Sequence, residues 1–527
     1  MPKFKVMVTD KLSDKGVKVF QADPDIQCDV LPTPSPEDLL KIIPEYDALV
    51  IRSATNVTAE VLEAAKKLKV IGRAGVGLDN VDIPASTRAG VIVMNTPDGN
   101  TISAAEHTMA LMLSLARKIP QAHQSLKEKK WDRNKFMGLE MFGKTLGVIG
   151  LGRIGFEVAK RARAFEMRIL AFDPYSTPEK AALVGAELTT IDAILKEADF
   201  ITVHVPKTKE TTNLINAESL KKCKKGVRLI NVARGGIYNE ADLAEALKSG
   251  QVGGAGIDVF SEEPPTGNPL LDADNIVLTP HLGASTEEAQ VNVAEVVAIQ
   301  IVDALHGRTI ANAVNIPAIS LEDWKAVQPY YRMAQNLGRF AGQFFAGSIK
   351  SVEITYGGEV AKKKPEALTR VLLKELLGGR MDQPVNEVNV QVLAKEMGIK
   401  VSETKVEAGD FTTHMGLKVE TDTGLRVLEA ASAGASTQIV NLDGFRVAIP
   451  TEGSLIIFFN KDLPGMIGKA STVLGEAGVN IASLTNGRKE KGGEAVTVIN
   501  VDGKVEDSVV GKLNAIPGVK NASVIQL

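Results

Sequence analysis

Three polar side chains that are far apart in the sequence could together move a proton and bind a carboxylate. His281 follows an apolar run that is expected to be a strand, and an imidazole titrates close to neutral pH, so it can take a hydroxyl proton and return it. Glu263 follows another expected strand and could hydrogen-bond the far ring nitrogen of His281, which would fix its tautomer. Arg234 follows a third strand, and a guanidinium can bind a carboxylate or polarise a carbonyl. Loops that follow parallel strands converge on one cleft, where these residues would meet.

Taken singly, each of these residues also has an ordinary structural interpretation. A loop histidine has at least even odds of being structural, and an isolated Arg234 or Glu263 is more often a solvated charge. The remaining histidines favour structural or solvated positions, in an apolar helix, near helix ends, at a strand end or without a partner motif. These are His107, His123, His204, His306 and His414. The hypothesis of an acid–base site therefore depends on the three residues together.

A glycine-rich segment predicts a dinucleotide-binding loop. Gly150, Gly152 and Gly155 form a G-x-G-x-x-G pattern between an apolar strand and an expected helix. The first glycine permits a tight turn, the second lets backbone N–H groups approach the pyrophosphate, and the third lets helix and strand pack closely. A second strand ends at Asp173, roughly 20 positions after the loop, where a carboxylate can bind ribose hydroxyls and would repel a 2′-phosphate. The pattern predicts NAD rather than NADP; the alternative is a glycine-rich turn without a ligand.

Repeated alternation of β-rich and helical stretches predicts the elements that must position these residues. Two such series predict two parallel sheets with helices on both faces. The long helical runs Ser103–Arg117 and Thr286–Leu305 bracket the second series, so the chain is expected to leave the first lobe, build the second and return, with a cleft between them. The expected strands are Lys5–Val8, Ile26–Leu31, Ala48–Ile51, Val70–Gly72 and Val91–Met94, then Leu146–Ile149, Arg168–Phe172, Phe200–Val205, Arg228–Val232, Ala255–Val259 and Val277–Leu278.

The C-terminal part of the chain has a different character. Helical patterns at Leu321–Phe345 and Pro365–Leu377 precede strand-like runs, with no catalytic motif. The last 75 or so residues have the element order βαββαβ, which is ferredoxin-like. The predicted class is therefore α/β, with two doubly wound parallel-sheet lobes, an α+β intervening domain and a ferredoxin-like domain. The predicted boundaries are 1–98 with 286–316 for the substrate lobe, 99–285 for the NAD lobe, 317–452 for the intervening domain, and 453–527.

Composition excludes several other classes of protein. The chain has 61 Lys and Arg against 64 Asp and Glu, which gives a formal net charge of −3. This charge does not favour binding to nucleic acid or to a membrane surface. No apolar run approaches the ~20 residues needed to span a bilayer. Cys28 and Cys223 are the only cysteines in the 527 residues, too few for a disulfide framework or a metal cage. We expect a cytoplasmic protein without a metal.

Four segments resemble the signature blocks of the D-2-hydroxyacid dehydrogenase family. They are Asn231–Gly236, Asp258–Pro264, Pro280–Gly283 and the loop Gly150–Gly155, and the resemblance covers residues 1–316. It implies an NAD-dependent dehydrogenase in which Arg234 binds the substrate, His281 is the acid and base, and Glu263 pairs with it. It further implies that a set of residues on strand-end loops lines the dinucleotide. These are Val76, Arg153, Ile154, Val205, Val232, Ala233, Asp258, Leu282, Gly283 and Ala284.

The first lobe carries candidate substrate contacts. Backbone N–H groups at Gly75 and Val76 could bind a carboxylate. Arg52, which is next to Ser53, could bind a phosphate or a carboxylate; alternatively, Arg52 forms a surface salt bridge. These segments are similar to the substrate lobe of family members that act on 3-phospho-D-glycerate. The basic segment Trp131–Lys135 could also reach the substrate, including across a subunit interface; whether Arg133 or Lys135 does so stays open.

The C-terminal segments Lys461–Gly468 and Gly478–Ala482 resemble an ACT domain, which binds small effectors, commonly amino acids, between paired copies. The resemblance implies that Asp462 holds an amino group and that Asn480 binds the carboxylate or side chain, although Asn460 stands where an aromatic residue is common. Residues 318–450 resemble the intervening domain of the long, ACT-containing class of the family.

The resemblance to this long class implies oxidation of 3-phospho-D-glycerate to 3-phosphohydroxypyruvate, the first committed step of L-serine biosynthesis. It also implies feedback by L-serine in a homotetramer or homodimer. Two alternatives stay open. One is a hydroxypyruvate or glyoxylate reductase of the same family, and the other is an NAD-sensing, corepressor-like binding protein.

Overall fold

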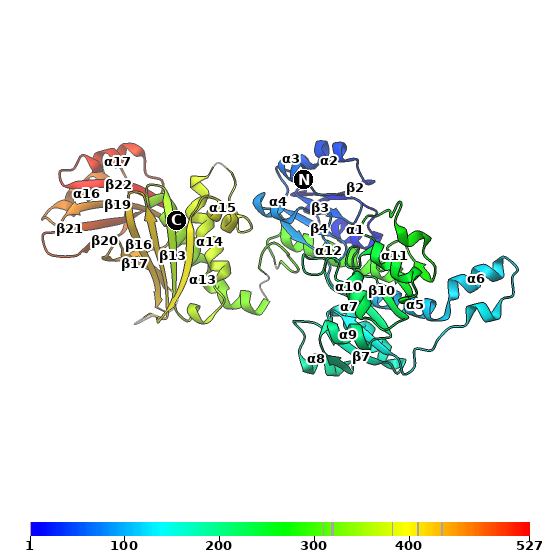
Figure 1. Cartoon of the computed structure of the whole chain (residues 1–527). Coiled ribbons are helices and arrows are strands. Elements are labelled where there is room, and N and C mark those ends of the chain that lie inside the picture. The colour runs from blue at the N-terminus through cyan, green and yellow to red at the C-terminus, as the bar shows by residue number, and fades with distance from the viewer. Residues whose placement is uncertain (1, 309, 318–320, 382, 408–410, 434–435) are drawn as a thin grey trace.

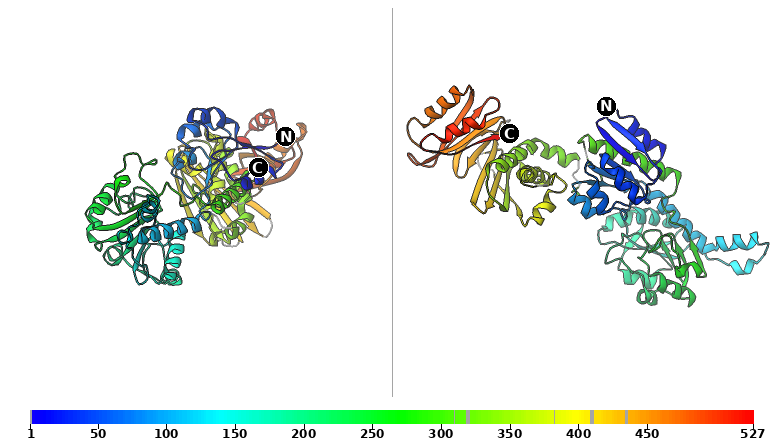
Figure 2. Two further views of the ribbon diagram at one scale, coloured as in Figure 1. Left: turned by 90° about the vertical axis from the view of Figure 1, so that its right-hand side faces the viewer. Right: turned by 90° about the horizontal axis from the view of Figure 1, so that it is seen from above.

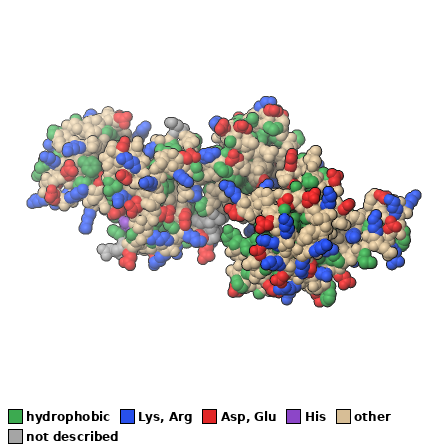
Figure 3. Space-filling view, viewed as in Figure 1, with side chains coloured by type: hydrophobic (Ala, Val, Ile, Leu, Met, Phe, Trp, Pro, Cys, Tyr) green, Lys and Arg blue, Asp and Glu red, His purple; other side chains and the backbone are tan. Residues whose placement is uncertain are grey.

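The protein has a mixed α/β fold, and the residues described by the structure form four separate sheets. The computed structural model describes residues 2–308, 310–317, 321–381, 383–407, 411–433 and 436–527. Residue 309 of the predicted substrate lobe, and residues 318–320, 382, 408–410 and 434–435 of the predicted intervening domain, lie outside the described ranges. The first two sheets lie in one half of the molecule and the last two in the other (Figure 1). On the face shown in Figure 3, acidic and basic side chains are interspersed, in agreement with the small net charge.

The N-terminal sheet has five parallel strands in the order β2-β1-β3-β4-β5. Every residue of β3 is buried because helices cover both faces, as expected for a parallel sheet. Helix α12 returns to this sheet and packs against α1 so closely that a Cβ on Gly16 would lie 2.6 Å from the carbonyl oxygen of Ala294. The elements are β1 (Phe4–Val8), α1 (Asp14–Gln21), β2 (Ile26–Val30), α2 (Pro36–Ile42), β3 (Ala48–Ile51), α3 (Ala59–Ala64), β4 (Val70–Arg73), α4 (Ile83–Arg88), β5 (Ile92–Met94) and α12 (Glu287–Leu305).

The second sheet has seven parallel strands in the order β12-β11-β10-β9-β6-β7-β8. The direction of winding reverses between β6 and β9, and open α/β sheets bind ligands at such a switch point, beyond the carboxyl ends of the strands. The elements are α5 (Thr101–Arg117), β6 (Thr145–Ile149), α7 (Arg153–Ala164), β7 (Arg168–Phe172), α8 (Pro178–Leu183), β8 (Ala186–Leu188), α9 (Ile191–Glu197), β9 (Phe200–Val203), α10 (Ala217–Lys222), β10 (Val227–Asn231), α11 (Glu240–Lys248), β11 (Val252–Ile257) and β12 (Ile276–Leu278).

An arm projects from the second sheet's half of the molecule (Figures 1 and 2). It consists of α6 (Ile119–Lys127), a 3₁₀ turn at Arg133–Phe136 and the segments that flank them. Large apolar side chains on the arm are exposed, with Trp131 and Met137 both more than three-quarters accessible. Large exposed apolar side chains are typical of surfaces that contact another molecule.

The intervening unit is a six-stranded sheet in the order β14-β13-β15-β16-β17-β18 with helices packed on it. Strands β13 and β14 are parallel, and the other neighbours are antiparallel. Its elements are α13 (Leu321–Phe344), β13 (Ile349–Gly358), α14 (Glu366–Leu377), α15 (Val390–Glu396), β14 (Lys400–Val406), β15 (Thr413–Thr421), β16 (Gly424–Ala433), β17 (Ser436–Leu442) and β18 (Phe445–Pro450).

The C-terminal sheet has the antiparallel order β20-β21-β19-β22, which is the ferredoxin-like arrangement predicted from the sequence. Side chains on one face of it, such as Leu455 and Val496, share a core with the intervening unit, while those on the other face pack under α16 and α17. Its elements are β19 (Ser454–Lys461), α16 (Met466–Glu476), β20 (Ile481–Arg488), β21 (Glu494–Val501), α17 (Asp507–Asn514) and β22 (Val519–Gln526). Within the described residues, no helix is both long and apolar enough to span a bilayer.

Candidate active site

The three predicted catalytic residues follow three neighbouring strands. Arg234 follows β10, Glu263 follows β11 and His281 follows β12, and these strands are adjacent in the second sheet. Because the strands are parallel, their carboxyl ends lie at the same edge, and the residues that follow them are brought together.

His281 and Glu263 form a hydrogen-bonded pair. The Nδ1 atom of His281 lies 2.8 Å from Oε2 of Glu263, whose Oε1 accepts a hydrogen bond from the backbone N–H of Phe260 at 3.1 Å. An ionised carboxylate only accepts hydrogen bonds, so Nδ1 of the imidazole carries the proton. The neutral ring then presents the lone pair of Nε2, which has no partner among the described residues. The pair is poised to accept a proton at Nε2.

Arg234 contacts the first lobe. Its Nε atom lies 3.2 Å from Oδ2 of Asp79, which is in the loop after β4, and its NH1 group donates to the carbonyl oxygen of Ala233 at 2.7 Å. The amide of Asn231 fixes the loop by donating to the carbonyl oxygen of Arg234 at 2.9 Å. The guanidinium is therefore held at the junction of the two lobes, with an exposed carboxylate as its counter-ion.

Two more arginines lie beside Arg234. Nε of Arg73 donates to Asn80 at 2.9 Å, and the Asn80 amide donates to the carbonyl oxygen of Arg52 at 2.8 Å. Burial, and next the charge of Arg234, lower the pKa of Arg73 to about 10. Nε of Arg52 is buried without a partner among the described residues. Three guanidinium groups this close favour an anionic ligand.

Arg73 was not singled out from the sequence, although it stands at the end of a strand, two residues before Gly75, where a functional side chain is common. The other predicted substrate residues also lie at this edge. Ser53 is exposed beyond β3, and the carbonyl oxygen of half-buried Val76 accepts a hydrogen bond from Asn95 at 2.6 Å.

The glycine loop has the geometry of a phosphate cradle. Gly150 has φ +97°, and a Cβ there would lie 2.6 Å from the carbonyl oxygen of His204. A Cβ on Gly155 would collide with the carbonyl oxygen of Gly150, whereas a Cβ on Gly152 would meet no atom within 4 Å. The first and third glycines are thus required by packing, and the second faces open space at the start of α7. This arrangement fits a dinucleotide pyrophosphate.

Other predicted cofactor residues surround this loop. Asp173, at the end of β7, accepts hydrogen bonds from the backbone N–H groups of Leu151 and Tyr175, both at 2.8 Å. Arg153 forms an ion pair with Asp98, which is in the first lobe. The rest lie in α7 or follow strands β9, β10 and β12. These are Ile154, Val205, Val232, Ala233, Leu282, Gly283 and Ala284.

Asp258 organises the loop that carries His281. Its side chain is fully buried and accepts hydrogen bonds from the backbone N–H groups of Leu282 at 2.7 Å and Gly283 at 2.9 Å. It also accepts from the Thr279 hydroxyl at 2.6 Å and lies 3.1 Å from Nε2 of His107. Burial alone would raise the pKa of Asp258, but hydrogen bonds from His107, Thr279 and Leu282 hold it below its usual value. The sequence interpretation of His107 as a packed helix residue missed this polar contact.

Comparison with known protein families identifies the family to which the chain belongs. Residues 109–283 match the NAD-binding domain of the D-isomer specific 2-hydroxyacid dehydrogenases. Residues 326–442 match the D-3-phosphoglycerate dehydrogenase intervening domain, and residues 454–518 match the ACT domain. Curated D-3-phosphoglycerate dehydrogenases from Archaeoglobus fulgidus and Methanocaldococcus jannaschii are 43% and 44% identical over 99% of this chain and 100% of their own length. The chain belongs to the D-3-phosphoglycerate dehydrogenase family.

Solved structures agree with the assignment of the dehydrogenase part of the chain. The TT0316 protein from Thermus thermophilus superposes with a TM-score of 0.55 at 35% identity, covering 59% of this chain and 99% of that one. A D-lactate dehydrogenase from Aquifex aeolicus, solved with NAD and lactic acid, has a TM-score of 0.54 at 28% identity, covering 59% of this chain and all of that one. The predicted enzyme class, an NAD-dependent dehydrogenase, and the predicted cofactor, NAD, are confirmed.

The two predicted effector residues lie apart within one chain. Asp462 follows the end of β19 that pairs with Glu494, and it accepts hydrogen bonds from Arg488 at 2.7 Å and the backbone N–H of Gly492 at 3.1 Å. Asn480 precedes β20 at the opposite end of the sheet, where its amide donates to Asp502 at 2.7 Å. One copy of the domain does not bring the two side chains together.

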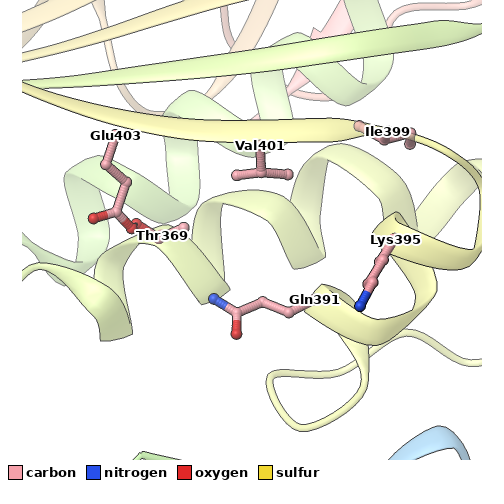
Figure 4. A pocket seen from close by; sticks show the side chains of 6 residues that line it. All are labelled: Thr369, Gln391, Lys395, Ile399, Val401 and Glu403. Carbon is pink, nitrogen blue, oxygen red and sulfur yellow. The ribbon is translucent and has the colours of Figure 1, made fainter.

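A hollow of about 520 Å³ lies in the intervening domain, between β14, α14 and α15 (Figure 4). Glu403 and Lys395 extend from opposite sides of it, with Val401 between them. Its lining residues are Thr369, Gln391, Lys395, Ile399, Val401 and Glu403. None of the residues predicted to bind substrate, cofactor or effector lines this hollow.

Proposed function

We propose that this chain oxidises 3-phospho-D-glycerate to 3-phosphohydroxypyruvate with NAD, in the first committed step of L-serine biosynthesis. One observation carries the proposal: the cluster of Arg52, Arg73 and Arg234 lies at the edge of the sheets where the His281–Glu263 pair also stands. A substrate with a phosphate and a carboxylate supplies the negative charge that this cluster favours. The printed names of the full-length relatives point to the same substrate.

The roles of the side chains follow from their geometry. Nε2 of His281 takes the proton of the C2 hydroxyl, and Glu263 stabilises the resulting imidazolium through Nδ1. Arg234 binds the carboxylate, whose charge replaces that of Asp79, and orients the carbon that reacts. Arg52 and Ser53 bind the phosphate, and the backbone at Gly75 and Val76 completes the substrate site.

We assign the cofactor to the loop Gly150–Gly155, with the ribose hydroxyls on Asp173. NAD, when bound, accepts the hydride that leaves C2. Closing the lobes excludes water from the reacting groups. The residues that we propose to line the dinucleotide are Val76, Arg153, Ile154, Val205, Val232, Ala233, Asp258, Leu282, Gly283 and Ala284. The domain boundaries predicted above are part of the proposal, and the four separate sheets support them.

An NADH-coupled assay tests the substrate. We expect turnover with 3-phospho-D-glycerate and NAD, and little with unphosphorylated D-glycerate, glycolate or NADP. The change Arg52→Ala should impair the phosphorylated substrate far more than hydroxypyruvate, while Arg52→Lys should retain part of the activity. Turnover with D-glycerate but none with 3-phospho-D-glycerate would favour the hydroxypyruvate or glyoxylate reductase instead.

His281→Ala should lower kcat by about 10²- to 10⁴-fold while NADH still binds. A variant that keeps its activity would contradict the role assigned to His281.

We also propose that L-serine inhibits the enzyme at the ACT domain. Because Asp462 and Asn480 lie at opposite ends of one sheet, a site that uses both requires a second copy related by a twofold axis, which brings opposite ends together. Inhibition by L-serine should be lost in Asp462→Ala with basal turnover retained. An Asp462→Ala enzyme that is still inhibited normally would contradict the assignment.

The assembly that we propose is a homotetramer or homodimer. The exposed apolar side chains of the arm, Trp131 and Met137 among them, support an interface between copies that could carry Arg133 and Lys135 to a neighbouring cleft. Light scattering of the intact chain tests this, and a monomer would contradict it. The two unpaired thiols, Cys28 and Cys223, support a cytoplasmic location.

A further inference from the structure

Two side chains in the first two turns of α5 form hydrogen bonds with the loop that carries His281. The hydroxyl of Ser103 donates to the carbonyl oxygen of Gly283 at 2.9 Å. One turn later on the same face, Nε2 of His107 lies 3.0 Å from Oγ1 of Thr279 and 3.1 Å from Oδ1 of Asp258. Two side chains of one helix, four residues apart, therefore contact both ends of the segment 279–283.

The acceptors in this cluster determine which atom donates in each hydrogen bond. The carboxylate of Asp258 only accepts, so the hydroxyl of Thr279, 2.6 Å away, donates its proton to it. The oxygen of Thr279 then has a lone pair left for a donor, and Nε2–H of His107 reaches that oxygen and the carboxylate together. The Nε2 atom of His107 is therefore protonated. Its N–H gives Asp258 a polar partner from outside the loop, in addition to Thr279 and the N–H groups of Leu282 and Gly283.

Helix α5 also lies at the junction of the lobes. It begins at Thr101, a few residues after the last strand of the first sheet, and its middle packs under β11, where a Cβ on Gly256 would lie 3.2 Å from Cβ of Leu111. Just before the helix, Gly99 lies against Val293 of α12, the other helix that connects the lobes. The contacts of Ser103 and His107 thus tie the catalytic loop to the point where the chain passes between lobes.

We propose that His107 is a positioning residue of the reaction. Through Thr279 and Asp258 it fixes the backbone of residues 281–283, and with it the direction of the His281 imidazole toward the substrate. Ser103 holds the far end of the same loop at Gly283. The proposal deepens the proposed dehydrogenase function and rests on it. A loop that is free to shift would leave the catalytic pair hydrogen-bonded but misplaced.

Three variants of the full-length chain test this role. His107→Leu should lower kcat by about 10- to 100-fold, as expected for a misplaced reacting group, with a much smaller change in KM for 3-phospho-D-glycerate. In His107→Gln the amide nitrogen can occupy the place of Nε2, and most of the loss should be restored. Thr108→Val is the matched control: Thr108 is fully buried in the next position of α5, but among the residues that the structure describes its hydroxyl bonds only to the carbonyl oxygen of Ala104 within the helix. It should keep the wild-type kcat.

Melting temperatures and a double variant separate positioning from simple loss of stability. In His107→Leu combined with Thr279→Val, kcat should be no lower than in the worse single variant, because both side chains act through the same hydrogen-bond cluster around Asp258. Wild-type kcat in His107→Leu would overturn the proposal. So would equal losses in His107→Leu and His107→Gln, or independent losses that multiply in the double variant.

A failure of the positioning role of His107 can be distinguished from a failure of the proposed dehydrogenase function. If the wild-type chain oxidises a different hydroxy acid, the variants are assayed with that substrate. If it oxidises none, the ring-nitrogen chemical shifts of His281 in ¹⁵N-histidine-labelled protein provide the readout. They should move in His107→Leu and return in His107→Gln; unchanged shifts in His107→Leu would overturn the positioning role.

Discussion

At the scale of single residues, two arginines of the proposed ligand sites, Arg234 and Arg153, are each paired with an aspartate of the other lobe. Arg234 contacts Asp79 and Arg153 contacts Asp98, and in each pair the arginine comes from the second sheet and the aspartate from the first. Both aspartates are about 70% exposed, and exposed ion pairs contribute only about 0–1 kcal/mol. A carboxylate or pyrophosphate at the proposed sites could therefore displace them at little cost. Without such a ligand, Asp79 offsets the repulsion between Arg234 and Arg73.

Removing the aspartates should strengthen binding selectively. In Asp98→Asn the arginine of the cofactor loop loses its internal counter-ion, so the dissociation constant of NADH should fall by about 2- to 5-fold, the range that an exposed pair allows. Fluorescence titration with NADH measures this.

Asp79→Asn is the matched control for that experiment, because Asp79 faces the substrate arginine instead. It should lower KM for 3-phospho-D-glycerate and leave NADH binding unchanged. An Asp98→Asn enzyme that binds NADH more weakly would show that the pair supports the cofactor site rather than competing for it.

At the scale of elements, a buried aspartate ties the loops of the first sheet together. Asp10, just after β1, accepts hydrogen bonds from the backbone N–H groups of Arg52 and Thr55, both at 2.9 Å, and from the hydroxyls of Thr55 and Thr33. The end of β3, where Arg52 stands, is thereby fixed to the end of β1. Burial tends to raise the pKa of Asp10, but these hydrogen bonds outweigh it and lower the pKa.

Stability of the first lobe should therefore depend on acid pH. A carboxyl group with a lowered folded-state pKa contributes stability that is present above its unfolded value of 3.8 and is lost as the pH falls through the folded value. We expect the melting temperature to fall below about pH 4, and less steeply in Asp10→Asn, which is less stable at neutral pH. Calorimetry from pH 7 to pH 3 measures both; parallel pH profiles for the variant and the wild type would contradict the assignment to Asp10.

The strands that precede the predicted catalytic residues could be predicted, because each forms a short apolar run that is visible in the local sequence. Strands β3 and β7 have the predicted bounds, and the ends of β10 and β11 were placed only one or two residues late. Strand β8 was missed because it is an edge strand whose Glu187 and Leu188 are exposed, so it lacks the apolar run that marks the equally short β5 and β12. In the intervening domain the sequence indicated the strand-like runs Leu417–Thr421 and Gln438–Leu442, which lie in β15 and β17. The strands β13, β14, β16 and β18 were not predicted, since strand pairing and register are set by partners elsewhere in the chain rather than by local spacing.

The site was predictable to the same extent. Arg234, Glu263 and His281 each stand at a recognisable strand end. The partners Asp79, Asp98 and His107 acquire their contacts only when separate lobes or distant segments meet, and no periodicity in the sequence reports such contacts.

At the scale of the whole molecule, the intervening domain touches the substrate lobe. The amide of Asn386 donates to the carbonyl oxygen of Gly90 at 2.8 Å, and α15 packs against α4. On its other side the intervening domain shares a core with the ACT sheet. Within one chain, these contacts link the proposed effector site to the lobe that carries Arg52.

Breaking the contact at Gly90 should weaken regulation without affecting catalysis. We expect Asn386→Ala to raise the L-serine concentration for half-inhibition several-fold, while kcat and KM without L-serine stay the same. Asn441→Ala is the control, because the side chain of Asn441 bonds to Glu429 and Gly444, both within the intervening domain. Normal inhibition of Asn386→Ala would show that the signal travels by another route, such as through a neighbouring subunit.

The core shared by the intervening domain and the ACT sheet has a consequence for how such enzymes are assembled in evolution. Leu455, Ile457 and Val496 lie in the same cluster as Phe345 and Phe445, so neither domain can be lost or exchanged without exposing apolar surface on the other. A gene that gained or shed regulation would have to do so by transferring residues 321–527 as one block. Solved relatives that match over 99% or more of their own length while covering only 59% of this chain are consistent with this.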